Sequence, residues 1–262
     1  GVVTPGLVYF ETGVSEISVS KGWLKGDIRV KEHLERELEL PTYVANRSRV
    51  AALGEYQVGV GRGVSNLIYL FLGQGIVAGI VIDGQLYLGS GSGSGEIGHV
   101  SVDPEGPLCD CGNRGCLECY ATEAAILAHA RSIARENVDG LLQHAVDGHL
   151  ERLTMDQMIH AAQQDDPSAL AVLNDAGTRV GFAVSILIDL FDPEMVIIGG
   201  PIGSHAGEFL LPSVVREAQL RTLPRFVRRT RIVVGELGTK AVAIGAAVLA
   251  INHTPVDAIF GS

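Results

Sequence analysis

Four cysteines lie between Cys109 and Cys119, and this clustering constrains the fold more than any other feature of the chain. Disulfide frameworks staple segments that are distant in sequence, whereas Cys109 and Cys111 are too close to each other to bridge comfortably. The pattern instead fits a loop that aims several sulfur atoms at one point. It also predicts reduced thiols, as in a cytoplasmic protein.

A histidine precedes the cysteines, and the full spacing reads His99-x9-Cys109-x-Cys111-x4-Cys116. One imidazole and three thiolates form a closed tetrahedral donor set, which structural zinc prefers. Gly112 and Gly115 give the loop the backbone freedom that such a site needs. The sequence therefore predicts zinc, with chance disulfides as the alternative. Cys119 fits a small buried apolar residue on the following helix better than a fifth ligand.

The composition of the 262 residues excludes several classes of protein. Hydrophobic residues make up 47% and charged residues 19%, which is enough for a full core in one large domain or two lobes. A net charge of −10 disfavours binding of a phosphate backbone by this chain itself. We find no run of about 18 apolar residues and no signal peptide, so we expect a cytoplasmic protein without a membrane span.

Helical and strand-like patterns alternate along the chain, which predicts an α/β fold. Helices are predicted over 27–40, 48–58, 123–136, 154–164, 167–191 and 239–251. Strands are predicted over 1–9 with a break at Pro5-Gly6, and over 42–45, 66–72, 80–82, 85–88, 195–198 and 232–234. Asp83-Gly84 suits the turn of a hairpin, and a glycine–serine loop follows over 89–95.

Four segments of the chain together resemble the ROK family, whose name stands for repressor, open reading frame and kinase. They are 83–118, which includes Glu96-Ile97-Gly98-His99 and the cysteine loop, then Asn46 with 51–55, then 195–200, and finally 244–247. The resemblance covers essentially the whole chain. It implies a two-lobed actin-like sugar-kinase (ribonuclease H-like) fold that binds sugar between the lobes.

The same resemblance implies a division of the chain. Residues 1–48 and about 245–262 would form the remainder of the small lobe, whose start is missing, and 49–244 the large lobe with the zinc loop. The implied sugar contacts are Asn46, Glu96, His99 and Glu118, with His99 also a zinc ligand. Carboxylates accept hydrogen bonds from sugar hydroxyls, an asparagine both donates and accepts, and a metal-bound histidine keeps one ring nitrogen free.

The chain departs from the family kinases at the general base. Those kinases carry Asn-Asp in the segment matched by Asn46-Arg47, and the aspartate takes the proton from the sugar hydroxyl. Arg47 stays protonated and cannot accept it. No carboxylate lies between Pro41 and Gly54, so a misalignment by one residue does not restore the base.

A second departure lies in the glycine-rich phosphate loop of the family, matched here by 73–79. Gln74 stands where the family has a hydroxyl, and Val77 and Ala78 add side chains where we expect bare backbone N–H groups. The family's first phosphate motif, of the Asp-x-Gly-Gly-Thr type, and a helix-turn-helix domain are not visible in this chain.

These departures predict a sugar-sensing, effector-binding module of a ROK transcriptional regulator, with no catalytic residue and with zinc as a structural cofactor. Its ligand would be a sugar or, with Arg47 near the pocket, an acidic sugar or a sugar phosphate. We expect a homodimer or homotetramer that meets DNA only through an N-terminal domain outside this chain. The alternatives are an ATP-dependent hexose or N-acetylhexosamine kinase, and an assembly domain with a vestigial pocket.

Overall fold

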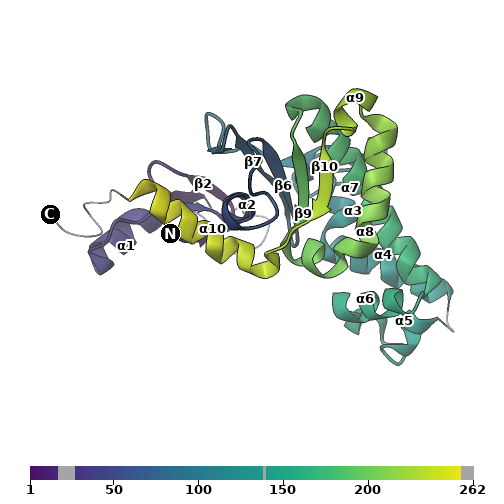
Figure 1. The fold of residues 1–262 in the computed structure, drawn as a ribbon. Coiled ribbons are helices and arrows are strands. Elements are labelled where there is room, and N and C mark those ends of the chain that lie inside the picture. Colours follow the sequence, from purple (N-terminus) through teal and green to yellow (C-terminus); the bar gives the residue numbers. More distant parts are fainter. Residues whose placement is uncertain (17–26, 138–139, 255–262) are drawn as a thin grey trace.

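The computed structural model describes residues 1–16, 27–137 and 140–254. Its centre is a five-stranded sheet in the order β10-β9-β6-β7-β8 (Figure 1). The strands are β6 (Leu67–Leu72), β7 (Ile76–Ile82), β8 (Gln85–Tyr87), β9 (Met195–Gly199) and β10 (Arg231–Val234). The first three run antiparallel, and β9 and β10 continue the sheet parallel to β6. This is the strand order of a ribonuclease H-like fold, and it confirms the predicted α/β class.

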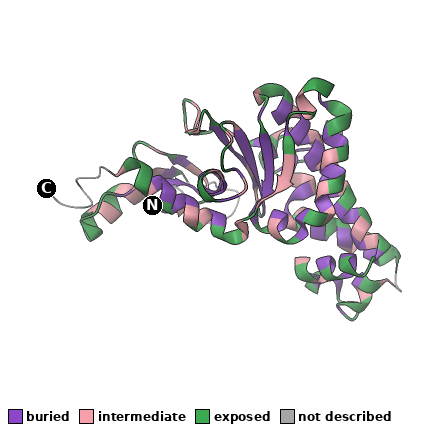
Figure 2. Cartoon of the chain, viewed as in Figure 1, coloured by how far each residue is buried: buried purple, intermediate pink, exposed green. Residues whose placement is uncertain are grey.

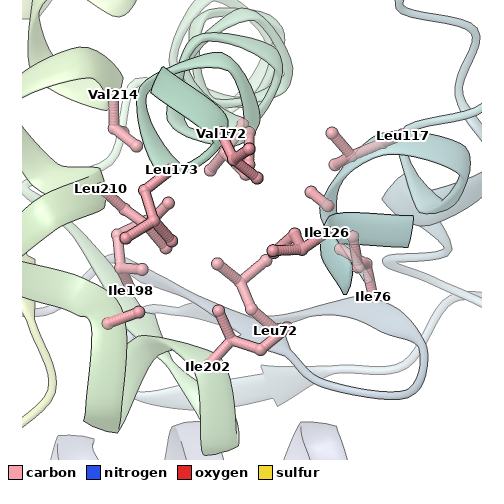
Figure 3. Close-up of a cluster of buried hydrophobic side chains, with 14 of the residues drawn as sticks. Leu72, Ile76, Leu117, Ile126, Val172, Leu173, Ile198, Ile202, Leu210 and Val214 are labelled. Atoms are coloured by element: carbon pink, nitrogen blue, oxygen red, sulfur yellow. The ribbon is translucent and has the colours of Figure 1, made fainter. Parts of the chain in front are cut away.

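Strand β6 is buried along its whole length because helices cover both faces of the sheet. Its alternate side chains enter two different cores, as the period of a strand requires. Ile68, Leu70 and Leu72 belong to the larger core, which α7 (Pro167–Phe191) and α8 (Gly200–Arg221) complete (Figure 3). Leu67, Tyr69 and Phe71 face α2 (Arg47–Val58) on the opposite side.

Helix α7 is the one helix in the described part of the chain that is long and apolar enough to cross a membrane. Its first turn is set by Pro167 and by the Asp166 carboxylate, which accepts a hydrogen bond from the Ala169 N–H at 2.8 Å. Its buried residues pack against α8 and belong to the same core as strand β6, and the inner strands of the sheet are coloured as buried in Figure 2. The length and the apolar character are therefore those of a core helix.

Two smaller sheets lie near the N-terminus. β1 (Val2–Thr4) pairs parallel with β5 (Val44–Asn46), and β2 (Leu7–Tyr9), β3 (Val14–Glu16) and β4 (Asp27–Arg29) form an antiparallel sheet. The helix predicted over 27–40 is wrong at its start, since α1 spans only Val30–Leu38. Residues 27–29 instead pair with β3, a long-range contact that overrides their local helical pattern.

Two glycines bring α2 against α10 (Ala241–His253). A Cβ atom on Gly54 would overlap the Ala241 carbonyl oxygen, and one on Gly245 would overlap the Val50 carbonyl oxygen. The helix backbones therefore touch, and the small-residue pattern predicted for 239–251 serves this contact. Because α2 also packs on β6 and β7, the contact fixes where the start of α2 lies.

Most of the remaining predicted elements are confirmed. Helices α4 (Glu123–Glu136) and α7 have the predicted bounds, and α6 (Met155–Gln163) begins at a capping box made by Thr154 and Gln157. Helix α8 was not predicted. The further short helices are α3 (Glu118–Ala121), α5 (Leu141–His144) and α9 (Pro224–Val227). The division into lobes at about 48 and 245 stays a prediction, and 17–26 and 255–262 lie outside the described residues.

Candidate functional site

The cysteine loop folds back on itself through backbone contacts. Bridges join Ser101 to Cys116 and Leu108 to Arg114, so the two ends of the loop lie side by side. The Cys109 N–H donates to the Asn113 carbonyl at 2.8 Å and closes the turn. Two glycines make this path possible, and both have positive φ: Gly112 at 92° and Gly115 at 63°. A Cβ on Gly115 would also overlap the Asp103 carbonyl oxygen.

This loop brings the four predicted metal ligands together. One ligand atom from each of four residues lies within 4.8 Å of all the others, and these are His99, Cys109, Cys111 and Cys116. The Sγ atoms of Cys111 and Cys116 are 3.6 Å apart, and Cys109 Sγ lies 3.8 Å from His99 Nδ1. Zinc–sulfur bonds of about 2.3 Å at a tetrahedral ion place two sulfurs about 3.8 Å apart. The cluster can therefore hold a metal ion.

The buried thiol of Cys116 needs a nearby cation to ionise at neutral pH. Burial and the neighbouring thiols of Cys111 and Cys109 raise the pKa of Cys116 to about 12. A metal ion reverses this effect because it binds the thiolate directly. All four cysteines are free of disulfides in this structure. Cys119 is half-buried on α3 and lies outside the four-residue cluster, and burial raises the pKa of its thiol to about 11.

Two carboxylates lie near the segment 99–116 that carries the four candidate ligands, which we call the metal loop. Glu118 begins α3, and its Oε1 atom accepts a hydrogen bond from the Ile76 N–H at 2.8 Å. Gly98 passes so close to it that a Cβ there would lie 2.9 Å from the same oxygen. Glu96 precedes a single 3-10 turn over Ile97–His99. Burial raises the pKa of Glu96, Arg49 and His99 oppose the rise, and Glu118 adds to it.

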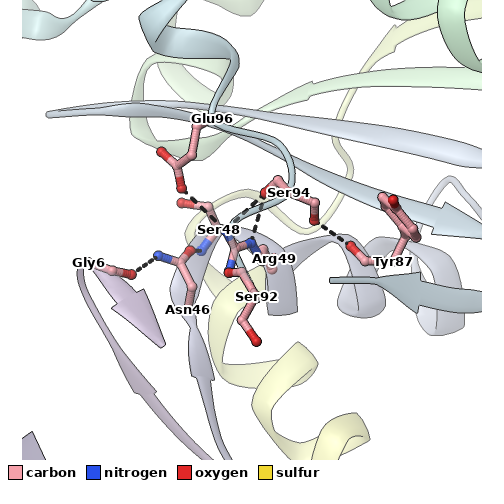
Figure 4. A network of polar contacts seen from close by, with 8 residues as sticks. All are labelled: Gly6, Asn46, Ser48, Arg49, Tyr87, Ser92, Ser94 and Glu96. Carbon is pink, nitrogen blue, oxygen red and sulfur yellow. Dashed lines mark hydrogen bonds and ion pairs between the residues drawn. The ribbon is translucent and has the colours of Figure 1, made fainter. Parts of the chain in front are cut away.

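Arg49 is a residue of this region that the sequence analysis missed. Its side chain is only 2% exposed, and its Nη2 atom lies 3.2 Å from Glu96 Oε1 (Figure 4). The guanidinium also donates to the backbone carbonyls of Ser92 and Ser94 in the glycine–serine loop. The only available signal was an arginine placed next to the apolar run 50–53, on a helix that has to be buried.

Asn46 is the N-cap residue of α2. Its side-chain oxygen accepts a hydrogen bond from the Ser48 N–H at 2.8 Å and so caps the helix. Its amide nitrogen donates to the Gly6 carbonyl at 2.7 Å. One N–H and one lone pair of the amide remain for another partner. Its role as a sugar contact stays a prediction.

Arg47 begins α2, and its guanidinium carbon lies 5.2 Å from the centre of the Phe71 ring. Within the described residues it has no ion pair. The nearest acidic residue along α2 is Glu55, which is fully buried and accepts hydrogen bonds from the N–H groups of Val60 at 3.1 Å and Leu237 at 2.9 Å. Glu55 is therefore committed to the fold and does not replace a missing base.

The glycine-rich segment 73–79 differs from its prediction. Strand β7 begins at Ile76, so only 73–75 form a turn. The side chain of Ala78 is buried in the larger core, and Gly79 lies under Ala52 of α2. Ala78 therefore does not obstruct a phosphate loop, contrary to the prediction, because its side chain is buried in the core.

A ribonuclease H-like sheet, carboxylates beside a His/Cys metal loop and a helix that begins at the same region define the class of actin-like sugar-kinase folds. The chain belongs to the ROK family, whose model matches residues 1–253. Both the predicted family and the predicted fold are confirmed.

Relatives of both kinds share this family. A glucokinase of Halalkalibacterium halodurans is 35% identical over 94% of this chain and 73% of that protein. A xylose repressor of Caldicellulosiruptor bescii is 29% identical over 96% of this chain and 62% of that protein. The chain thus spans less than two thirds of this repressor's length.

Solved structures give the same division. A ROK family transcriptional regulator, a homologue of the Escherichia coli Mlc protein, matches with a TM-score of 0.84 and 31% identity over 94% of this chain and 60% of that chain. A ROK family glucokinase from Streptomyces griseus, in complex with glucose and AMPPNP, has the same TM-score of 0.84 and 30% identity over 96% of this chain and 81% of that chain. Overall similarity therefore does not distinguish a regulator from a kinase. The distinction has to come from the residues of the site.

Proposed function

We propose that this chain is the sugar-sensing, effector-binding part of a ROK transcriptional regulator that has lost kinase chemistry. The observation that carries the proposal is made at the start of α2. There the cationic side chain of Arg47 occupies the position of the general base of the family kinases. Arg47 lies against the Phe71 ring and cannot take a proton from a sugar hydroxyl.

No neighbouring carboxylate compensates for this loss. Glu55 is buried with both carboxylate oxygens bonded to backbone N–H groups. Glu96 is paired with Arg49, and Glu118 accepts a backbone hydrogen bond from Ile76 at the start of β7. Such a bond fixes the orientation of the carboxylate, whose oxygens can then accept hydrogen bonds from the hydroxyl groups of a ligand. The region thus supports binding of a ligand without a reaction.

The proposed sugar contacts are the side chains of Glu96, His99 and Glu118, with Asn46 as a further contact from α2. Ionised carboxylates accept hydrogen bonds, which sugar hydroxyls donate. His99 links this set to the metal loop. We propose zinc as the ion, because three thiolates and one imidazole match its preferred donor set. Four protein ligands would fill the tetrahedral coordination of the ion, as in a structural zinc site, and would leave no open position for catalysis.

Sugar binding would close the two lobes and shift the relative position of the subunits in a homodimer or homotetramer of a cytoplasmic protein. DNA contact in this proposal comes from an N-terminal domain outside this chain. The net charge of −10 agrees with a chain that does not bind DNA itself.

The test is thermal unfolding of zinc-loaded protein against neutral sugars, amino sugars, sugar acids and sugar phosphates. A ligand at a hundredfold excess over its dissociation constant stabilises by about 2.7 kcal/mol. We expect a rise in melting temperature with one sugar class that disappears in Glu96→Ala. No rise with any of them would refute the sensor and favour an assembly domain with a vestigial pocket.

The 35% identity to a glucokinase makes an ATP-dependent hexose or N-acetylhexosamine kinase the second candidate. Incubation with ATP, magnesium and each hexose, followed by ADP measurement, separates the two. We expect no sugar-dependent ADP above the background of an Arg47→Met variant. Sugar-dependent turnover by the unmodified chain would establish the kinase instead.

A further inference from the structure

Arg49 is a buried cation on α2 that the proposed chemistry does not explain. A buried arginine is costly to desolvate, and replacement of a buried ion pair by apolar groups is often neutral or stabilising. Burial lowers the pKa of Arg49, and only Glu96 opposes that effect. Because the desolvation of this guanidinium is unfavourable, we look for a role of Arg49 other than stability.

The partners of Arg49 show what it holds. Its Nε and Nη2 atoms donate to the Ser94 carbonyl at 3.2 and 2.9 Å, and Nη1 donates to the Ser92 carbonyl. Its Nη2 atom also donates to Glu96 Oε1 at 3.2 Å. These bonds use most of the five N–H groups of a guanidinium, so Arg49 has little left to offer a ligand.

Glu96 is held by one oxygen only. Its side chain is 42% exposed, and no group in the described part of the chain bonds its Oε2 atom. Figure 4 shows this oxygen turned away from Arg49, while Oε1 points towards the guanidinium. The pair therefore leaves one carboxylate oxygen presented outward in a fixed direction.

We propose that Arg49 is a positioning residue that fixes Glu96 and the glycine–serine loop 89–95 on helix α2, so that Glu96 Oε2 receives a hydroxyl of the ligand. The proposal rests on the proposed sugar-binding function. The loop contains glycines at 89, 91, 93 and 95, which do not order it by themselves. The Ser92 hydroxyl also accepts a hydrogen bond from the Phe10 N–H at 3.5 Å. The loop held by Arg49 therefore also contacts the segment that follows β2.

The experiment compares Arg49→Met, Arg49→Lys, Glu96→Gln and the double variant Arg49→Met/Glu96→Gln. Arg62→Met, on an exposed turn, is the matched control. Amide hydrogen exchange of 89–96 is measured without ligand, and binding of glucose and of xylose is measured by calorimetry. Melting temperature and zinc content verify that each variant is folded and loaded.

We expect Arg49→Met to speed exchange in 89–96 and to weaken sugar binding about tenfold to a hundredfold. Arg49→Lys should restore part of both effects, and Arg49→Met should add less than about twofold in the Glu96→Gln background because the two residues act as one unit. Arg62→Met should change neither quantity. If Arg49→Met fails to fold, Arg49→Lys carries the same comparison with a smaller loss.

Unchanged exchange and unchanged affinity in Arg49→Met would overturn the inference, as would full additivity with Glu96→Gln. Absence of glucose and xylose binding by the unmodified chain, with fast exchange in Arg49→Met, would count against these two sugars as ligands while supporting the anchoring of the loop. Absence of binding together with unchanged exchange would overturn both proposals.

Discussion

Gly245 offers a sharp test of how the start of α2 is positioned. It lies inside α10, where a change from glycine to alanine ordinarily gains about 1 kcal/mol through helix propensity. Here the added Cβ would overlap the Val50 carbonyl oxygen and lie 3.3 Å from the Ala51 nitrogen. These atoms belong to the backbone of α2 and cannot move aside like the end of a side chain.

The overlap therefore forces the two helices apart. Overpacking of this kind costs about 1–3 kcal/mol, and the upper end applies because backbone meets backbone. After the gain from helix propensity, we expect a net loss of about 1–2 kcal/mol and a fall in melting temperature of about 2–8 °C for a chain of this size. Because α2 carries Asn46 and Arg49, sugar affinity should fall as well.

Differential scanning calorimetry of Gly245→Ala measures the first effect. The control is Gly91→Ala, since a Cβ at Gly91 meets no atom within 4 Å. It should change stability by no more than about 0.5 kcal/mol. A higher melting temperature for Gly245→Ala would show that helix propensity outweighs the contact, and it would refute the close approach of α2 and α10.

Three further changes test the metal loop, a buried hydroxyl and a carboxylate. Cys116→Ser should lose zinc, measured by mass spectrometry of the metal, and lower the melting temperature, whereas a Cys119→Ser protein without zinc would contradict the four-ligand assignment. Burial raises the pKa of Tyr69 from 10.0 to about 12, so the stability that its protonated form contributes is lost as the pH rises between those values. Urea unfolding should show this loss in the unmodified chain and a smaller one in Tyr69→Phe, and equal slopes would disprove the assignment. Glu118→Ala should cost about 1–3 kcal/mol in urea unfolding, because the Ile76 N–H loses its acceptor, and a change near zero would mean that water replaces it.

The sequence predicted which four side chains come together in the cysteine loop, because the determinants of this grouping are local. The spacing from His99 to Cys116, with glycines at 112 and 115, is enough to define which atoms converge. Strand β4 could not be predicted in this way, since its residues follow a helical pattern and become a strand only by pairing with β3. Burial of Arg49 likewise depends on the loop 89–95, which lies more than forty residues away in the chain.

Helix α8 escaped prediction for a different reason. Glycines at 200, 203 and 207 and the internal Pro212 all disfavour a helix on local grounds. The structure shows their use: Gly203 packs against the backbone of Ile198 and Gly207 against the side chain of Val234. A larger residue at either position would separate α8 from the sheet. Tertiary packing thus overrides propensity where the sheet needs close contact with the helix.

The site is built from two pieces, which are joined by the ion pair of Arg49 and Glu96, and this arrangement shows how binding and chemistry can separate in one family. Glu96, His99 and Glu118 form the first piece, in which Glu118 bonds the start of β7 and His99 belongs to the cluster of metal-ligand candidates. The position of the base lies on α2, which its own cap at Asn46 and the contact with α10 fix. An arginine at position 47 alters only the second piece, because it stacks on Phe71 and bonds none of the three side chains that we propose as sugar contacts. A chain can therefore lose the base without disturbing the groups that would bind a sugar.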